Sequence, residues 1–366
     1  MEWLQKLTGG RVPIVLIFGY PNTTTFLGGT IWIKKVVEYI EKSEVLAIRK
    51  VNCALKAKWR FFSRLVNLYV VLKGFVINPD IAILDTYGDA CLLMWIMFRF
   101  FRPSTKIVTI FHHYEPRSNK HKDGRIITLL YCRLLDLLTR IMLDNSDNII
   151  TVSMSSSRQL KHFIKIRDSN KIAIVGCSYS KDLSVVTSES KDIDFLCVGR
   201  FEKFHGMEDI WKIIKEKMNG SKFVVVGRAS SKEVLRLHRI GIEHKGIVSE
   251  EDKYKLYSRA KVLIFPSMFE GYGIAVTEAL AAGMTIIAWK LPVFQERFGY
   301  MTSGVRLVEM GKLSLFAEEA LSAVANCSKL HQPIVHYVRN YPRSKSWQDV
   351  SKDVISVLEQ CTTSRY

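Results

Sequence analysis

The chain alternates short runs of β-branched and other apolar residues with longer stretches in which apolar residues recur every three or four positions. The short runs predict strands and the longer stretches predict helices. In the first half, we expect strands at residues 12–19, 45–51, 81–85, 106–112, 148–153 and 171–177. We expect helices at 30–40, 55–75, 89–101, 126–143 and 155–163. Because the strand runs are apolar throughout, they are expected to pair in parallel and to be covered by helices on both faces.

The same alternation starts again at Ile193 and continues to about Ala325. Between the two series, residues 178–192 are polar, rich in serine and without periodicity, which is typical of a linker. We therefore predict an α/β protein with two doubly wound, Rossmann-like domains, each built on a parallel sheet. The predicted boundaries are an N-terminal domain at 1–180, a linker at 181–192 and a C-terminal domain at 193–335. A final helix within 336–366 is expected to pack back toward the N-terminal domain.

Composition excludes several classes of protein. Of the 366 residues, 48% are hydrophobic and 24% are charged, which is not the composition of a disordered or collagen-like chain. The seven cysteines are an odd number without CxxC spacing, which argues against a disulfide scaffold and against a cysteine-ligated zinc site. No run approaches the roughly 18 apolar residues of a transmembrane helix, and the N-terminus is too mixed for a signal peptide. We expect a cytoplasmic protein, either soluble or peripheral on the inner face of a membrane.

The charge of the chain is unevenly distributed. Its 53 Lys and Arg exceed its 35 Asp and Glu by 18, and residues 1–180 hold 26 of the former and 13 of the latter. In the predicted helix 55–75, the side chains of Lys56, Arg60 and Arg64 recur at i, i+4 and i+8 beside Trp59. This pattern fits an interfacial helix on anionic lipid, or an ordinary amphipathic helix with its basic side in water. Basic charge alone would also suit nucleic-acid binding, but no RNP motif, zinc finger or recognition helix accompanies it.

The most informative segment is 261–290, KVLIFPSMFEGYGIAVTEALAAGMTIIAWK. A buried strand at 262–265 ends at Pro266, and a glycine-rich turn at 270–273 leads into a helix at 274–282. A strand, a glycine turn and a helix N-terminus together provide backbone N–H groups for an anion.

Two glutamates lie in this segment. Glu278 is surrounded by apolar or small residues and should be buried, so its carboxylate needs a partner. That partner is either a ligand diol, such as a ribose, or a basic residue on a neighbouring helix. Glu270, at the mouth of the turn, either accepts sugar hydroxyls or is a solvated loop residue.

Glu270 and Glu278, with seven residues between them, resemble the E-x7-E signature of family-four retaining glycosyltransferases of GT-B fold. Other segments resemble that family in the same order along the chain. These are Gly28-Gly29-Thr30, the FHHYEP motif at 111–116, FLCVGRFEKFHG at 195–206 and the stretch 244–267 that leads into E-x7-E. The resemblance is dense over 195–289 and thinner before residue 150.

The resemblance implies that the C-terminal domain binds a nucleotide-diphosphate sugar and the N-terminal domain binds the acceptor, with the chemistry in the cleft between them. Arg200 would hold the diphosphate, and Glu278 the ribose. The family's usual lysine before Gly206 is replaced by His205, so either Lys203 or His205 would be the second phosphate ligand. The base would lie against the turns at 227–228 and 246–248, which include Ile247. The remaining donor contacts implied are Gly28, Gly29, Gly271, Tyr272 and Gly273.

The catalytic residues implied are His112, Glu270 and Arg200, with His112 near the reacting carbon and His113 on the acceptor side. Transfer would retain the anomeric configuration through diphosphate stabilisation and positioning. No metal and no cofactor are expected. The acceptor is a glycan, a protein or a lipid-linked or phosphate-bearing molecule. A sugar-nucleotide epimerase or a phosphorylase of the same fold is the alternative.

Overall fold

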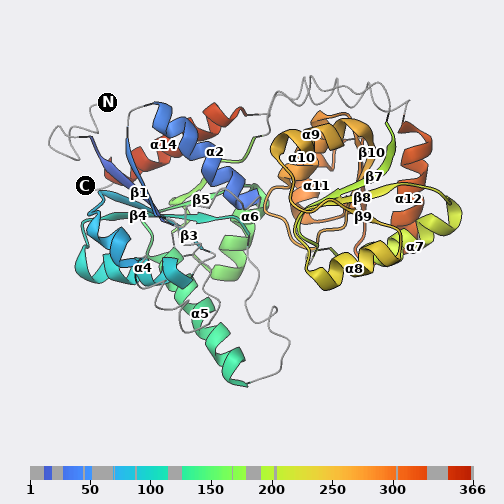
Figure 1. The fold of residues 1–366 in the computed structure, drawn as a ribbon. Helices are drawn as coiled ribbons and strands as arrows, with labels where there is room; N and C mark the ends of the chain where they lie inside the picture. Colours follow the sequence, from blue (N-terminus) through green and yellow to red (C-terminus); the bar gives the residue numbers. More distant parts are fainter. Residues whose placement is uncertain are drawn as a thin grey trace. The chain divides into compact units, whose positions relative to one another are not determined.

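The computed structural model describes residues 12–18, 28–43, 46–51, 69, 71–86, 89–113, 126–166, 168–178, 191–201, 204–301, 304–327 and 345–363. The chain divides into two compact units (Figure 1). The first unit comprises Met1–Cys177 and Trp347–Tyr366, and the second comprises Ser178–Ser346. The C-terminal helix therefore belongs to the first unit.

The described strands of the first unit form one parallel sheet in the order β2-β1-β3-β4-β5-β6. They are β1 (Ile14–Phe18), β2 (Ala47–Val51), β3 (Ile81–Asp85), β4 (Lys106–Phe111), β5 (Asn148–Thr151) and β6 (Ile172–Ile174). The helices are α2 (Gly28–Lys42), α4 (Asp89–Phe101), α5 (Ile126–Asp144), α6 (Met154–Gln159), the π-helical turn η2 (Leu160–Ile164) and α14 (Trp347–Thr363). Strand β3 and helix α4 have their predicted bounds. Most of the predicted helix at 55–75 lies outside the described residues. The part of it that is described, residues 69 and 71–75, is helical.

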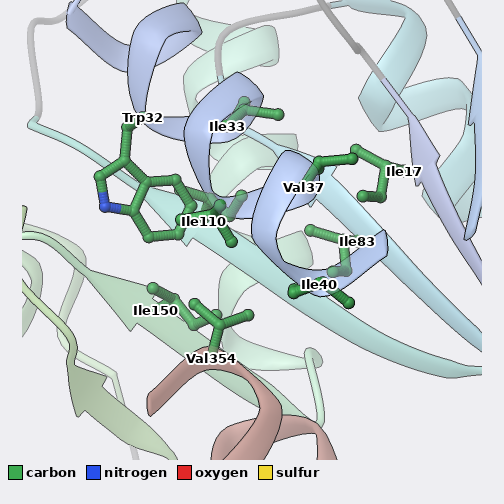
Figure 2. A pocket seen from close by; sticks show the side chains of 10 residues that line it. Ile17, Trp32, Ile33, Val37, Ile40, Ile83, Ile110, Ile150 and Val354 are labelled. Carbon is green, nitrogen blue, oxygen red and sulfur yellow. The ribbon is translucent and has the colours of Figure 1, made fainter. Parts of the chain in front are cut away.

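Apolar side chains fix α2 and α14 to this sheet. Figure 2 shows side chains of α2 facing those of the strands and of α14 around a small apolar space. The labelled residues are Ile17, Trp32, Ile33, Val37, Ile40, Ile83, Ile110, Ile150 and Val354. The Ser351 hydroxyl of α14 also donates a hydrogen bond to the Val36 carbonyl of α2 at 3.4 Å. Helix α14 is thus part of the first unit's core, although it comes last in the chain.

The second unit repeats the design with a parallel sheet in the order β12-β11-β10-β7-β8-β9. Its strands are β7 (Ile193–Val198), β8 (Phe223–Val226), β9 (Glu243–His244), β10 (Ala260–Phe265), β11 (Thr285–Trp289) and β12 (Val305–Val308). Its helices are α7 (Met207–Lys217), α8 (Ser231–Arg239), α9 (Glu250–Arg259), α10 (Ile274–Ala281), α11 (Pro292–Phe298) and α12 (Leu313–Ala325).

The core of the second unit is continuous and rich in aromatic residues. Phe195, Trp211 and Phe223 pack ring against ring between β7, α7 and β8. The central strands β7, β8 and β10 are apolar and almost wholly buried, as expected of parallel strands covered on both faces. This packing holds the carboxyl ends of the central strands at one edge, where open α/β sheets bind their ligands.

Among the described residues, no helix combines the length and the apolar composition needed to cross a bilayer.

Candidate functional site

Loops that follow neighbouring strands of the second unit are hydrogen-bonded to one another. The Gly227 amide donates to the Gly246 carbonyl at 2.8 Å, and the Phe201 amide donates to the Arg228 carbonyl at 3.0 Å. Gly227 has a φ of +131°, and a Cβ at this position would lie 1.8 Å from the carbonyl oxygen of Gly199. Only glycine allows this approach, which brings the backbones of the loops after β7 and β8 into direct contact. Backbone hydrogen bonds thus connect the loops after β7, β8 and β9.

The loop after β10 joins the same edge. Phe204 and Ser267 form an antiparallel bridge, and the His205 amide donates to the Pro266 carbonyl at 2.9 Å. We call the set of loops at 199–201, 204–206, 227–228, 246–248 and 267–273 the carboxyl-end rim. The rim brings together residues that the sequence places up to 74 positions apart.

Helix α10 begins at this rim. Its N-cap is Gly273, at a φ of +83°, no side chain caps it, and its first turn carries no acidic residue. Arg297 of α11 holds the turn that precedes α10. Its guanidinium lies 3.5 Å from the centre of the Tyr272 ring, a cation–π contact. Arg297 also donates to the Tyr272 carbonyl at 2.7 Å and to the Thr277 hydroxyl at 2.9 Å. The N-terminus of α10 is therefore a rigid, electropositive end.

Glu270 lies in the turn before α10 and is half-buried. The Ser267 hydroxyl donates to its Oε1 at 2.9 Å. This bond orients the carboxylate within the rim, and an ionised carboxylate has acceptor capacity beyond one such bond.

Glu278 lies one turn into α10 and is 4% exposed, which confirms the predicted burial. Lys253 Nζ donates to its Oε1 at 2.9 Å, and the Tyr257 hydroxyl donates to its Oε2 at 3.1 Å. Both partners belong to α9, so the ion pair to a neighbouring helix, one of the two predicted alternatives, is present. A carboxylate offers about four lone-pair positions, so this pair uses only part of its capacity.

The burial of this cluster shifts its titration. Burial raises the pKa of Glu278, while Lys253 and then Tyr257 oppose that rise. Burial, together with the neighbouring carboxylate, raises the pKa of Tyr257 well above its ordinary value. The tyrosine therefore stays protonated and acts as a donor to Glu278.

Other predicted donor residues also lie at the rim. Arg200 is half-buried just after β7, His205 is exposed with its ring 6.3 Å from that of Trp289, and Ile247 is 52% exposed in the turn after β9. Lys203 lies outside the described residues, so the choice between Lys203 and His205 stays a prediction.

The first unit brings a second set of predicted residues together. His112 directly follows β4 and is buried, and its ring stands edge-on to that of Trp32 at 6.0 Å. The Ser156 hydroxyl of α6 donates to the His112 carbonyl at 2.5 Å. Trp32 belongs to the second turn of α2, the helix that begins at Gly28 and Gly29. The predicted residues Gly28, Gly29 and His112 thus lie at the same end of the first unit. His113, the next residue after His112, is half-buried.

The three basic residues predicted for a membrane surface, Lys56, Arg60 and Arg64, lie outside the described residues. Sequence reasoning missed Lys253, Tyr257 and Arg297, which hold the acidic segment. The available signal was the buried Glu278 itself, which required a cation from another element. In the described part of the chain, no group of three or more His, Cys, Asp and Glu side chains could hold a metal ion.

Solved structures establish the fold. Sucrose-phosphate synthase from Thermosynechococcus elongatus superposes with a TM-score of 0.72 at 15% identity, over 96% of this chain and 99% of that one. HepE from Anabaena, solved with UDP and glucose, gives a TM-score of 0.71 at 12% identity, over 95% of this chain and 100% of that one. The protein therefore has the GT-B fold, as predicted.

Sequence comparison identifies the family through the second unit. A glycosyltransferase of Methanocaldococcus jannaschii, described as uncharacterized, is 24% identical over 45% of this chain and 44% of its own length. The O-antigen chain mannosyltransferase RfbU of Salmonella typhimurium is 27% identical over 43% of this chain and 46% of its own length. The chain thus aligns with less than half the length of these curated relatives. The model of the family "Glycosyl transferases group 1" matches residues 179–332, so the second unit belongs to that family.

Proposed function

We propose that this chain is a retaining glycosyltransferase that moves a hexose from a nucleoside-diphosphate sugar to an acceptor. The observation that carries the proposal is the carboxyl-end rim, which collects Arg200, Glu270 and the N-terminus of α10 next to the buried Glu278. Cationic and N–H groups at one edge suit a diphosphate, and carboxylates beside them suit hydroxyls. The relatives' names and the solved complexes of HepE with UDP and UDP-glucose support a nucleotide sugar as donor.

In this proposal, Arg200 and the N-terminus of α10 stabilise the negative charge that develops on the departing diphosphate. Glu278 accepts ribose hydroxyls with the lone pairs that Lys253 and Tyr257 leave available. Glu270 accepts hydroxyls of the transferring sugar. In the first unit, His112 and the backbone of Gly28 and Gly29 contact the sugar, and the acceptor binds that unit. Neither glutamate acts as a nucleophile, and no metal takes part.

The test is calorimetric titration with UDP, GDP and ADP and their glucose or mannose derivatives in EDTA, followed by chromatography of the products. Arg200→Gln should weaken diphosphate binding at least tenfold. The matched control is Arg259→Gln, since Arg259 pairs with Asp192 near the amino-terminal end of β7. An absolute requirement for Mg²⁺ or Mn²⁺ would overturn the metal-free part. Conversion to an epimer, or cleavage that requires free phosphate, would show the alternative chemistry.

A further inference from the structure

Helix α5 of the first unit exposes aliphatic side chains along its whole length. The exposed fractions are 74% for Ile126, 59% for Leu130, 51% for Leu134 and Leu137, and 39% for Ile141. At 3.6 residues per turn and 1.5 Å per residue, these five lie within an arc of about 80° and form a stripe about 22 Å long. We call these five residues the α5 stripe.

The opposite face of α5 is the one that packs on its own unit. Cys132, Thr139 and Met142 are buried, and Leu135 and Leu138 contact the core cluster that contains Phe98 of α4. In Figure 1, α5 extends away from the sheet of the first unit toward its N-terminal end. The α5 stripe therefore does not belong to the core, and soluble monomers rarely expose so large a continuous apolar surface without a partner.

Charge indicates the nature of that partner. Arg133 and Arg140 are exposed, and both lie along the same border of the stripe, with the half-buried Asp136 between them in sequence. Tyr131, 47% exposed near the N-terminal end, adds an aromatic ring with a polar tip. Residues 1–180 carry twice as many basic as acidic residues. An aliphatic stripe bordered by arginines on a strongly basic unit is complementary to an anionic bilayer surface.

We propose that the α5 stripe is a docking surface for an anionic lipid bilayer. Its leucines and isoleucines would enter the headgroup boundary, and Arg133 and Arg140 would contact lipid phosphates. Such docking would direct the first unit toward acceptors held in a membrane. The inference concerns the first unit and does not depend on donor binding by the second.

The test is co-sedimentation of the full chain with vesicles of phosphatidylglycerol and phosphatidylcholine, or of phosphatidylcholine alone. Binding to the anionic vesicles should be partly released by 0.5 M NaCl, because salt screens the arginines but not the apolar contact. The triple variant Leu130→Gln, Leu134→Gln, Leu137→Gln should bind at least tenfold more weakly, and Arg133→Gln with Arg140→Gln should lose most of the salt-sensitive part. The control, Leu235→Gln with Leu315→Gln, changes leucines of the second unit that are 60% and 47% exposed, and should bind like the original chain.

Three outcomes would overturn the proposal. The original chain could remain in the supernatant with anionic vesicles at low salt. The triple variant could bind as the original chain does. In analytical ultracentrifugation without lipid, the chain could be a dimer that the triple variant dissociates, which would make the stripe an interface between copies. UDP titration of the same samples tests the proposed donor site independently, because the α5 variants should bind UDP as the original chain does.

Discussion

Helices α10 and α5 are both rich in apolar residues, but each has an unusual exposure pattern: α10 buries a charged side chain, whereas α5 exposes aliphatic ones. Helix α10 is almost wholly buried and places the carboxylate of Glu278 inside the core. Helix α5 places aliphatic side chains in water. The buried charge is compensated within its own unit, by Lys253 and Tyr257 of α9. The exposed stripe has no comparable compensation among the described residues, and this difference is why we propose a docking surface on α5 and not on α10.

The largest effect is expected from removing the cation beside Glu278. Lys253→Met leaves a buried carboxylate without its counter-ion and should lower the free energy of unfolding by about 3 kcal/mol at neutral pH. Urea unfolding monitored by tryptophan fluorescence measures this change. Lys290→Met is the matched control, because Lys290 forms an exposed pair with Glu309 at 2.7 Å and should cost less than about 1 kcal/mol.

The pH dependence of the same variant identifies the cause. The pKa of Glu278 is raised in the folded state, so folding takes up a proton between the ordinary and the raised pKa, and stability increases as pH falls through that range. Without Lys253 the pKa rises further, so the increase should begin at a higher pH in Lys253→Met. Adding Glu278→Gln to this variant should recover stability at neutral pH. Equal costs for Lys253→Met at every pH would show that lost packing, not the unpaired charge, is responsible.

The sequence predicted those parts of the molecule that depend on local pattern. Apolar runs and glycine turns gave both sheets and the bounds of β3 and α4, because strands covered on both faces have a distinctive composition. The burial of Glu278 followed from the apolar residues around it. The identity of the partners of Glu278 could not be predicted, because Lys253 precedes Glu278 by 25 residues and lies on a largely polar helix.

The α5 stripe was missed for a related reason. Its periodicity correctly predicted a helix at 126–143, but α5 carries apolar residues on most of its circumference. Which of these faces packs on the sheet depends on neighbours that the local pattern does not contain. Knowledge of α4 and of the core around Phe98 was needed to separate the buried residues from the exposed ones.

A smaller effect distinguishes Glu270 of the rim from Glu278 of α10. In the proposed function, Glu278 accepts the ribose hydroxyls in addition to the two donors of α9, and an amide cannot replace all of these contacts. Glu278→Gln should therefore weaken UDP binding by about 1–3 kcal/mol. Glu270→Gln should leave UDP binding within about twofold and lower kcat for transfer at least tenfold, a loss of about 1.4 kcal/mol in transition-state stabilisation. Titration of UDP and initial rates on the same preparations measure the two effects. If Glu278→Gln binds UDP as tightly as the original chain, Glu278 is only the structural partner of Lys253.

The smallest effect is expected on α5. Leu134→Gln exchanges a 51% exposed leucine for a good helix former and creates no cavity, so the free energy of unfolding should change by less than about 0.5 kcal/mol. Leu235→Gln, at a 60% exposed position on α8, should behave in the same way. Urea unfolding of the two variants beside the original chain provides the comparison. A loss of 2 kcal/mol or more for Leu134→Gln alone would mean that the α5 stripe is packed against another part of the chain. In that case the apolar side chains of α5 would have packing partners within the chain, as Glu278 of α10 has its ion-pair partner. The contrast between the two helices would then be wrong.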